Sequence, residues 1–191
     1  MFKASYSDKS LVVHILSESF DNNSSVNYII PQDKNRPFRI NALMDYSFEM
    51  CFDFGKVFLS DDRKACALVL FPEQKKTNFK SILLDLKLLF NCIGISNIGK
   101  AMSREAKIKN LQPKVPMYYL WFIGVDPEHQ NTGIGSTLMN ELVLESTKSN
   151  RPIYLETSTL KNLPWYDKFG FEVYNELDLG YKLFFLKREI S

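Results

Sequence analysis

The chain has 191 residues, enough for one domain of ordinary size with a full hydrophobic core. Apolar residues make up 45% and charged residues 24%, which is the balance of a globular protein in water. The formal net charge is only +2 and the two signs are interspersed, which argues against a nucleic-acid-binding protein that relies on a basic face.

Cysteine and histidine usage argues against a metal centre. Cys51, Cys66 and Cys92 are odd in number and form no CxxC pair, so neither a disulfide framework nor a zinc site is indicated. His14 and His129 are the two histidines of the chain. The N-terminus lacks the apolar core of a signal peptide, and the densest apolar run is too short to span a bilayer. We expect a cytoplasmic protein without membrane contact, either a monomer or a homodimer.

The N-terminal third alternates between helical and extended patterns. Apolar residues recur at helical spacing in two stretches, and a stretch rich in Asn, Ser and Pro between them predicts a loop. Gly55 would end the second helix, and two β-rich runs that follow predict a hairpin. The predicted ranges are 7–20 (helix), 22–38 (loop), 40–54 (helix), and 56–60 and 65–71 (strands).

The middle of the chain predicts two further helices. Residues 79–93 are strongly apolar but include Asp85 and Lys87, which predicts a well-buried amphipathic helix. A more polar helical stretch covers residues 98–108 and ends before Pro113. We expect the whole insertion, residues 79–110, to lie on the substrate side of the molecule.

The C-terminal part gives the clearest pattern, a strand–helix–strand unit followed by a short helix and two more strands. Their ranges are 117–125 (strand), 133–148 (helix), 152–157 (strand), 161–169 (helix closed by Gly170), and 171–174 and 183–186 (strands). Strands with one such crossover predict an α/β fold with a mixed sheet, and the crossover should be right-handed. We therefore expect a single domain over residues 1–191.

The loop between the first of these strands and its helix has the character of an anion site. It reads Gln130-Asn131-Thr132-Gly133-Ile134-Gly135-Ser136, directly after a strand that ends in Val125-Asp126-Pro127. Backbone N–H groups at a helix start have no intrahelical partners, and the helix dipole places partial positive charge there. Glycine also lets a phosphate approach the backbone closely.

Two common phosphate-binding motifs do not fit this loop. The P-loop pattern GxxxxGK[ST] is absent, because no lysine follows Gly135. A dinucleotide-binding fingerprint would need a third glycine where Leu138 stands. On the two glycines alone, a simple helix start with capping glycines is as good an interpretation as an anion site.

Two motifs in the right order resemble the GCN5-related N-acetyltransferase (GNAT) superfamily. Gln130-x-x-Gly133-x-Gly135 after a Val-Asp-Pro strand end resembles its acyl-CoA loop. Downstream, the segment from Asn162 to Phe171 resembles the Tyr-x-x-x-Gly-Phe helix end of the superfamily, and its Asn-x-Pro-aromatic-Tyr form is similar to the branch of puromycin N-acetyltransferase-like enzymes. The resemblance implies a central, mostly antiparallel sheet with one parallel strand pair at the acyl-CoA site, flanked by helices, with residues 117–191 as the acyl-CoA-binding core.

The resemblance also implies roles for individual residues. The strand edge would offer backbone groups to the pantetheine amides, the loop would hold the pyrophosphate of acetyl-CoA, and Asn162 would touch the pantetheine arm. Tyr166 would stand beside the thioester sulfur as the proton donor. The residues implied at the cofactor are Ile123, Gly124, Val125, Gln130, Asn131, Thr132, Gly133, Ile134, Gly135, Ser136, Asn162 and Tyr166, with no metal.

The general base is open on the sequence. Many members of the superfamily carry an acid on the strand before the phosphate loop, whereas residues 118–123 contain none. Glu156 on the next strand is the first candidate, with a structural carboxylate as the alternative interpretation and a water relay as a third. Gln130 could bind phosphate or only shape the turn, and Tyr166 could instead be a core aromatic residue.

The resemblance implies an acetyl-CoA-dependent N-acetyltransferase that acetylates a primary amine of a small molecule by direct transfer from the thioester. Two alternatives stay open. One is a sensor that binds acyl-CoA without turning it over, and the other is an enzyme that acetylates a protein's lysine or N-terminus. No nucleic-acid partner is expected.

Overall fold

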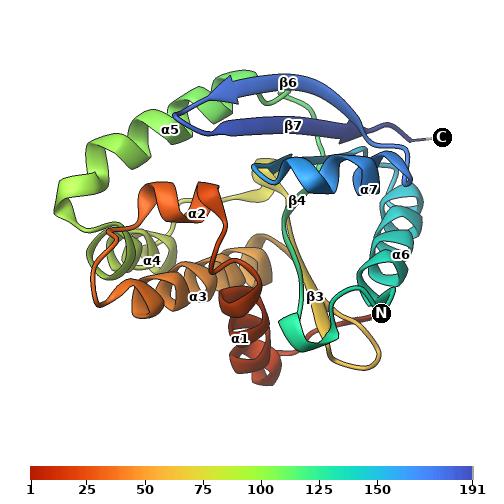
Figure 1. The fold of residues 1–191 in the computed structure, drawn as a ribbon, viewed down its shortest axis with the longest axis horizontal. Helices are drawn as coiled ribbons and strands as arrows, with labels where there is room; N and C mark the ends of the chain where they lie inside the picture. Colours follow the sequence, from red (N-terminus) through yellow and green to blue (C-terminus); the bar gives the residue numbers. More distant parts are fainter. Residues whose placement is uncertain (191) are drawn as a thin grey trace.

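The computed structural model describes residues 1–190 and consists of a seven-stranded sheet with helices on both faces (Figure 1). The strand order is β1-β2-β3-β4-β5-β7-β6, and every neighbouring pair is antiparallel except β4–β5. The strands are β1 (Phe2–Lys3), β2 (Gly55–Leu59), β3 (Ala65–Leu70), β4 (Tyr118–Val125), β5 (Ile153–Thr157), β6 (Glu172–Asp178) and β7 (Lys182–Arg188). The mixed α/β sheet with one parallel pair confirms the predicted fold class, and the handedness of the crossover stays a prediction.

Within residues 1–190 there are seven α-helices: α1 (Lys9–Ser19), α2 (Ser24–Ile29), α3 (Arg36–Phe54), α4 (Phe79–Leu88), α5 (Ile98–Leu111), α6 (Ile134–Lys148) and α7 (Leu163–Asp167). The loop predicted over 22–38 is therefore wrong in part, because it contains α2 and the start of α3. The Asn23 side chain accepts hydrogen bonds from the backbone N–H groups of Ser25 and Val26, so this polar residue caps a helix there. Pro37 lies in the first turn of α3, a position that proline tolerates.

The two faces of the sheet have separate hydrophobic cores. On one face α1 and α3 pack with Phe122 of β4, and on the other α6 and α7 pack with Leu120 of the same strand. Helix α5 packs on the β6–β7 hairpin through Ile108, Leu183 and Phe185. Figure 1 shows α5 and α2 approaching the end of this hairpin from one side, while α7 and α6 lie on the other.

Helix α4 is far less buried than its apolar sequence predicts. Among its residues only Ser81 and Leu84 are buried, whereas Phe79 is 85% exposed. The helix is apolar on both sides, and only the inner side packs against α3. Hydrophobicity alone does not distinguish these two sides, which is why the prediction of a well-buried helix is wrong. The outer apolar residues are Phe79, Ile82, Leu83 and Leu86.

Within residues 1–190, no single helix is long and apolar enough to cross a bilayer. The helical stretches Phe79–Ile93 and Ile95–Leu111 together meet the criteria of length and composition, but the chain bends by 99° between them.

Candidate active site

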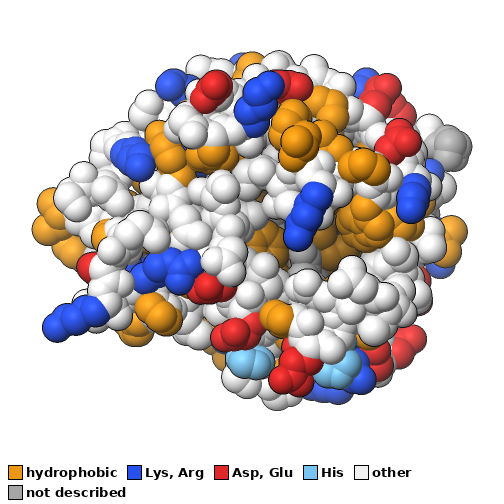
Figure 2. Space-filling view, viewed as in Figure 1, with side chains coloured by type: hydrophobic (Ala, Val, Ile, Leu, Met, Phe, Trp, Pro, Cys, Tyr) orange, Lys and Arg blue, Asp and Glu red, His pale blue; other side chains and the backbone are white. Residues whose placement is uncertain are grey.

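Strands β4 and β5 separate soon after they begin. They pair at only two positions, where Tyr118 lies opposite Ile153 and Tyr119 opposite Tyr154. Beyond Tyr119, β4 continues to Val125 beside β3 alone. The second half of β4 thus has one edge without a neighbouring strand, and the surface is hollowed below α7, where apolar side chains line the hollow (Figure 2).

A β-bulge accompanies this separation. On β3, the consecutive residues Leu68 and Val69 lie opposite Phe122 and Leu120, so Trp121 is an extra residue of β4. A bulge increases the local twist and bends the strand that carries it. The bend in β4 therefore begins two residues after its last pairing with β5.

Backbone groups of two residues point from β4 into the resulting gap. The N–H group of Asp126 donates to the Lys64 carbonyl on β3, at 2.9 Å. Because hydrogen-bonding direction alternates along an antiparallel strand, Gly124 also faces β3, whereas Ile123 and Val125 face away from it. Ile123 and Val125 are thus the residues whose main-chain groups can reach a ligand in the gap.

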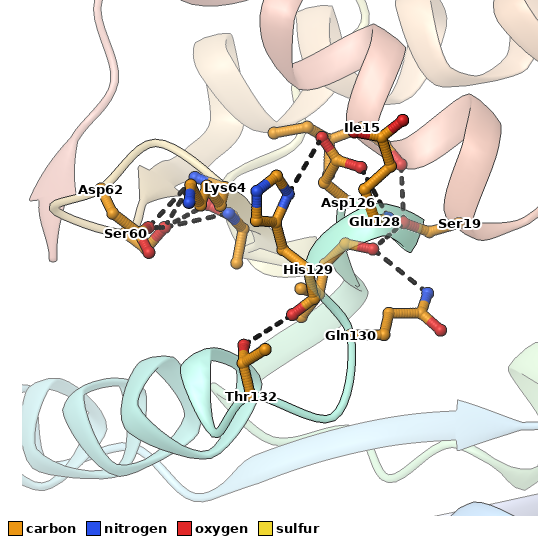
Figure 3. Close-up of polar contacts among 12 residues, drawn as sticks. Ile15, Ser19, Ser60, Asp62, Lys64, Asp126, Glu128, His129, Gln130 and Thr132 are labelled. Carbon is orange, nitrogen blue, oxygen red and sulfur yellow. Dashed lines mark hydrogen bonds and ion pairs between the residues drawn. The ribbon is translucent and has the colours of Figure 1, made fainter.

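Gly124 has a packing reason to be glycine. A Cβ atom there would lie 2.9 Å from Cδ2 of Leu16 and 3.0 Å from Oγ of Ser19, both on α1. The Ser19 hydroxyl in turn donates to the Val125 carbonyl at 2.8 Å (Figure 3). This contact ties α1 to the end of β4, just before the phosphate-loop candidate.

The Gln130 side chain folds back onto the strand end. Its Nε2 donates to the Val125 carbonyl at 3.2 Å (Figure 3). The Thr132 hydroxyl donates to the His129 carbonyl at 2.6 Å, and His129 Nδ1 lies 3.7 Å from an Asp126 carboxylate oxygen. In this geometry Gln130 contributes to the shape of the turn, and its contact with phosphate stays a prediction.

The loop exposes a row of unpaired N–H groups. The first backbone bond of α6 runs from the Thr137 N–H to the Gly133 carbonyl. Within the described part of the chain, the N–H groups of residues 131–136 have no hydrogen-bond partner. Asn131 (φ 61°) and Gly133 (φ 90°) adopt the left-handed conformation that turns the chain into the helix. A Cβ atom on Gly133 would meet nothing within 4 Å, so the space beside this residue is open.

The second glycine of the loop serves packing. A Cβ atom on Gly135 would lie 3.2 Å from Cγ2 of Val125, so glycine lets α6 start close to β4. The neighbouring Ser136 hydroxyl lies 3.0 Å from Nε1 of Trp165. This bond joins the start of α6 to α7, which carries Asn162 just before its first residue.

Tyr166 on α7 is buried by aromatic neighbours. It is 6% exposed, and its ring lies 4.9 Å from that of Trp165 and 5.7 Å from that of Phe171, measured between ring centroids. Within residues 1–190 no hydrogen bond joins its hydroxyl to another residue. Burial raises the pKa of Tyr166 because it disfavours the phenolate.

Glu156 on β5 is the centre of a hydrogen-bonded network. It accepts a hydrogen bond of 2.5 Å from the Tyr119 hydroxyl and one of 2.8 Å from Nε2 of Gln112. Burial raises the pKa of Glu156, and this effect outweighs the two donors and the charge of Arg104, which lower it. The carboxyl therefore takes up a proton more readily than an exposed glutamate.

The possible metal ligands and the three cysteines remain to be considered. Within residues 1–190 no group of three or more His, Cys, Asp or Glu side chains could hold a metal ion. The cysteines are free and buried, and burial raises the pKa of all three thiols.

Comparison with known proteins decides the family. Residues 93–173 match the family described as acetyltransferase (GNAT) domain. Over these residues the chain contains a GNAT acetyltransferase domain. This confirms the predicted superfamily and its class of enzyme, the acetyltransferases, while the puromycin-like branch stays a prediction.

Solved structures share the GNAT fold over the whole chain. A Corynebacterium glutamicum protein described as "histone acetyltransferase HPA2 and related acetyltransferase" is 22% identical, with a TM-score of 0.74 and coverage of 100% of this chain and 95% of that chain. Arylalkylamine N-acetyltransferase 2 from Aedes aegypti is 13% identical, with a TM-score of 0.67 and coverage of 100% and 98%.

A curated relative matches a short segment only. It is a probable serine/threonine-protein kinase from Dictyostelium discoideum, 29% identical over 80 residues. The match spans 41% of this chain but only 8% of that protein's length.

GNAT enzymes use acetyl-CoA, and the residues present suit that molecule. The unpaired N–H groups of residues 131–136 suit an anionic pyrophosphate, and the free edge at Ile123 and Val125 suits the pantetheine amides.

Sequence reasoning missed three residues around Glu156. They are Tyr119, Gln112 and Arg104, which approach from β4 and α5. No local motif marks them, because their contacts depend on how β4, β5 and α5 come together. The strand alternation that places Tyr119 on the opposite face from Tyr118 was the one available signal.

Proposed function

We propose that the chain is an acetyl-CoA-dependent N-acetyltransferase that transfers the acetyl group directly to a primary amine of a small molecule. One observation carries the proposal: the free edge of β4 leads directly into the unpaired N–H groups of residues 131–136. A strand edge followed by a positive helix end suits a ligand with amides at one end and a pyrophosphate at the other. In this assignment Asn162 contacts the pantetheine arm, and Tyr166 lies beside the sulfur.

Glu156 is the proposed proton acceptor, directly or through a water molecule. Amines arrive mostly as ammonium ions, so a proton must leave before the nitrogen can attack. The raised pKa of Glu156 brings this carboxyl closer to neutral pH, which favours proton uptake. The hydrogen bonds from Tyr119 and Gln112 fix its orientation.

Tyr166 is the proposed donor to sulfur. Bound acetyl-CoA supplies the thioester carbon that the amine attacks. As the N–C bond forms and the C–S bond breaks, the amine nitrogen loses a second proton and the thiolate gains one, so that the products are an amide and a thiol. The Tyr166 hydroxyl, which makes no hydrogen bond to another of residues 1–190, donates to the departing sulfur.

The contacts around the proposed acceptor site favour a small acceptor molecule. Helix α2, helix α5 and the turn between β6 and β7 meet through Ser25, Arg104 and Tyr181. This contact narrows the approach that a folded protein substrate would need. The name of the Aedes aegypti neighbour, arylalkylamine N-acetyltransferase, is in keeping with a small amine.

The test measures binding and turnover separately. Isothermal calorimetry measures CoA affinity, and thiol release from acetyl-CoA is followed with a panel of small primary amines and of peptides with free N-termini or lysines. We expect CoA binding, and thiol release with small amines that mass spectrometry detects as acetylated. CoA binding without release in any reaction would favour the sensor, and release with peptides alone would favour a protein acetyltransferase.

A further inference from the structure

Arg104 on α5 carries a positive charge without a carboxylate partner. Its Nε donates to the Tyr181 hydroxyl at 3.1 Å, and its Nη2 donates to the Ser25 hydroxyl. Tyr181 and Ser25 are also hydrogen-bonded to each other, at 3.2 Å. Within residues 1–190, no acidic side chain forms an ion pair with Arg104.

This arrangement is unusual for a partly buried charge. The Arg104 side chain is half-buried, and charges withdrawn from water are normally paired, because desolvation is costly. A guanidinium has five N–H donors in a planar fork that matches a carboxylate. Two of its three nitrogens are engaged by neutral hydroxyls, which leaves donors for a ligand that brings its own negative charge.

The same helix face also reaches the proposed base. Arg104, Ile108 and Gln112 follow each other at a spacing of four residues, which places them on one side of α5. Ile108 packs on Phe185, which lies opposite Glu156 in the β5–β7 pairing. Gln112 donates to the Glu156 carboxylate. Arg104 and Glu156 thus lie on the same side of the sheet, with about 12 Å of helix between the Cα atoms of Arg104 and Gln112.

A positive and a negative group at one site suit a ligand with both charges. Arg104 and Glu156 do not form an ion pair, yet the charge of Arg104 lowers the pKa of Glu156, so the two groups share one electrostatic environment. Lys100 lies one turn before Arg104, with its ammonium 3.9 Å from the centroid of the Tyr28 ring, and adds positive charge at this wall.

We infer that the acceptor is an amino carboxylate, whose amine faces Glu156 and whose carboxylate is held by the Arg104 guanidinium. The inference rests on the proposed function and names the substrate class of that site. Arg104 then determines specificity, because an amine without a carboxylate leaves the guanidinium unpaired in the complex.

The experiment uses matched ligands that differ in charge alone. Thiol release from acetyl-CoA is measured with glycine, β-alanine, 4-aminobutyrate and 5-aminovalerate, each beside its carboxamide. The variants are Arg104→Gln, Arg104→Lys and, as a control on an exposed position of the same helix, Lys107→Gln. Circular dichroism and thermal unfolding check that each variant is folded.

We expect the wild-type chain to use at least one amino carboxylate with a kcat/KM tenfold or more above that of its amide. Arg104→Gln should remove this preference, because KM for the carboxylate should rise tenfold or more while KM for the amide changes far less. Arg104→Lys should retain part of the preference, and Lys107→Gln all of it. Equal use of acids and amides, or an equal loss of both in Arg104→Gln, would overturn the inference and leave Arg104 as a contact between elements.

A binding measurement separates this inference from the proposed function. The amino carboxylates and amides are titrated into the CoA-loaded protein by calorimetry. If no amine is acetylated, the proposed function is wrong. Binding of the amino carboxylate that is lost in Arg104→Gln would still support the role of Arg104. Binding without preference for the carboxylate would overturn that role even in an active enzyme.

Discussion

Tyr166 combines a free hydroxyl with a buried ring. Because burial raises its pKa above the ordinary value of about 10, a phenolate at this position is unfavourable, whereas a thiol has a pKa of about 8.5. Complete proton transfer from this phenol to sulfur is therefore uphill in the free protein. We expect Tyr166 to stabilise the departing sulfur mainly by donating a hydrogen bond, with any proton that it gives up quickly replaced.

Replacing Tyr166 tests this role. Tyr166→Phe should lower kcat by tenfold or more, the scale of typical acid catalysis, while calorimetry shows a nearly unchanged CoA affinity. Tyr174→Phe is the control, because Tyr174 is a half-buried tyrosine that is likewise packed on aromatic rings, but on β6. An unchanged kcat in Tyr166→Phe, or an equal loss of kcat in both variants, would show that Tyr166 contributes packing and not catalysis.

The hydrogen bond between Tyr119 and Glu156 leads to a prediction about the pH dependence of kcat. The Tyr119 hydroxyl lowers the pKa of Glu156, because it donates a hydrogen bond to the ionised form. Tyr119→Phe should therefore shift the acidic limb of the kcat profile to higher pH, and Glu156→Gln should lower kcat tenfold or more at every pH. The measurement is a pH–rate profile with a saturating amine. A limb at the same pH in Tyr119→Phe would show that another group accepts the proton.

At the scale of elements, the start of α6 carries the proposed pyrophosphate site. Gly133→Glu should weaken CoA binding a hundredfold or more by calorimetry, since a carboxylate would stand in the open space before the unpaired N–H groups. Gly180→Glu is a matched control, because Gly180 has a φ of 84° and equally open surroundings, but lies in the β6–β7 turn. A similar loss in both variants would mean that backbone strain causes the effect.

A second element-scale feature joins α1, α3 and α4. Glu49 on α3 is 4% exposed and accepts a hydrogen bond from Tyr6, and it forms ion pairs with Lys9 and Lys80. Burial by itself would raise the pKa of Glu49, but the donors outweigh it and lower the pKa to about 2. The ionised carboxylate therefore stabilises the folded state above a pH of about 4.5, and this contribution is lost as the pH falls towards 2.

Glu49→Gln should imitate the protonated residue. We expect urea unfolding at pH 7 to show a loss of about 2–4 kcal/mol in the free energy of unfolding, and a smaller difference from wild type at pH 3. Glu105→Gln, in an exposed pair with Lys109 on α5, should cost about 0.5 kcal/mol or less. An equal loss in Glu49→Gln at both pH values would show that the ion pairs contribute nothing beyond packing.

At the scale of the whole molecule, the sequence predicts best those features that depend on residues close together in the chain. The glycine turn before α6 and the short helix around Tyr166 could be predicted, because each of these local structures depends on neighbours in the chain. The contact between Tyr119 and Glu156 could not, because it depends on a bulge and on the point at which two strands separate. The link between α5 and Gln112 has the same long-range origin.

The errors in the predicted fold have similar causes. Helix α2 lies within the predicted loop because Asn and Ser favour turns as well as helix caps. Strand β6 runs to Asp178, beyond the predicted residue 174, because polar residues such as Glu176 are acceptable on an edge strand. The predicted burial of α4 is wrong because its sequence is apolar on both sides, and only the three-dimensional arrangement determines which side is covered.

The short pairing of β4 with β5 also affects the thermodynamics of the chain. The main-chain groups of Ile123 on the β4 edge and the N–H groups of residues 131–136 lack protein partners within the described residues, so a ligand that satisfies them binds the folded state and not the unfolded one. Linkage then adds about 2.7 kcal/mol to the free energy of unfolding when the free ligand is at a hundred times its Kd. A cell that keeps its acyl donor abundant would thus hold this protein in a more stable form than any buffer without the donor.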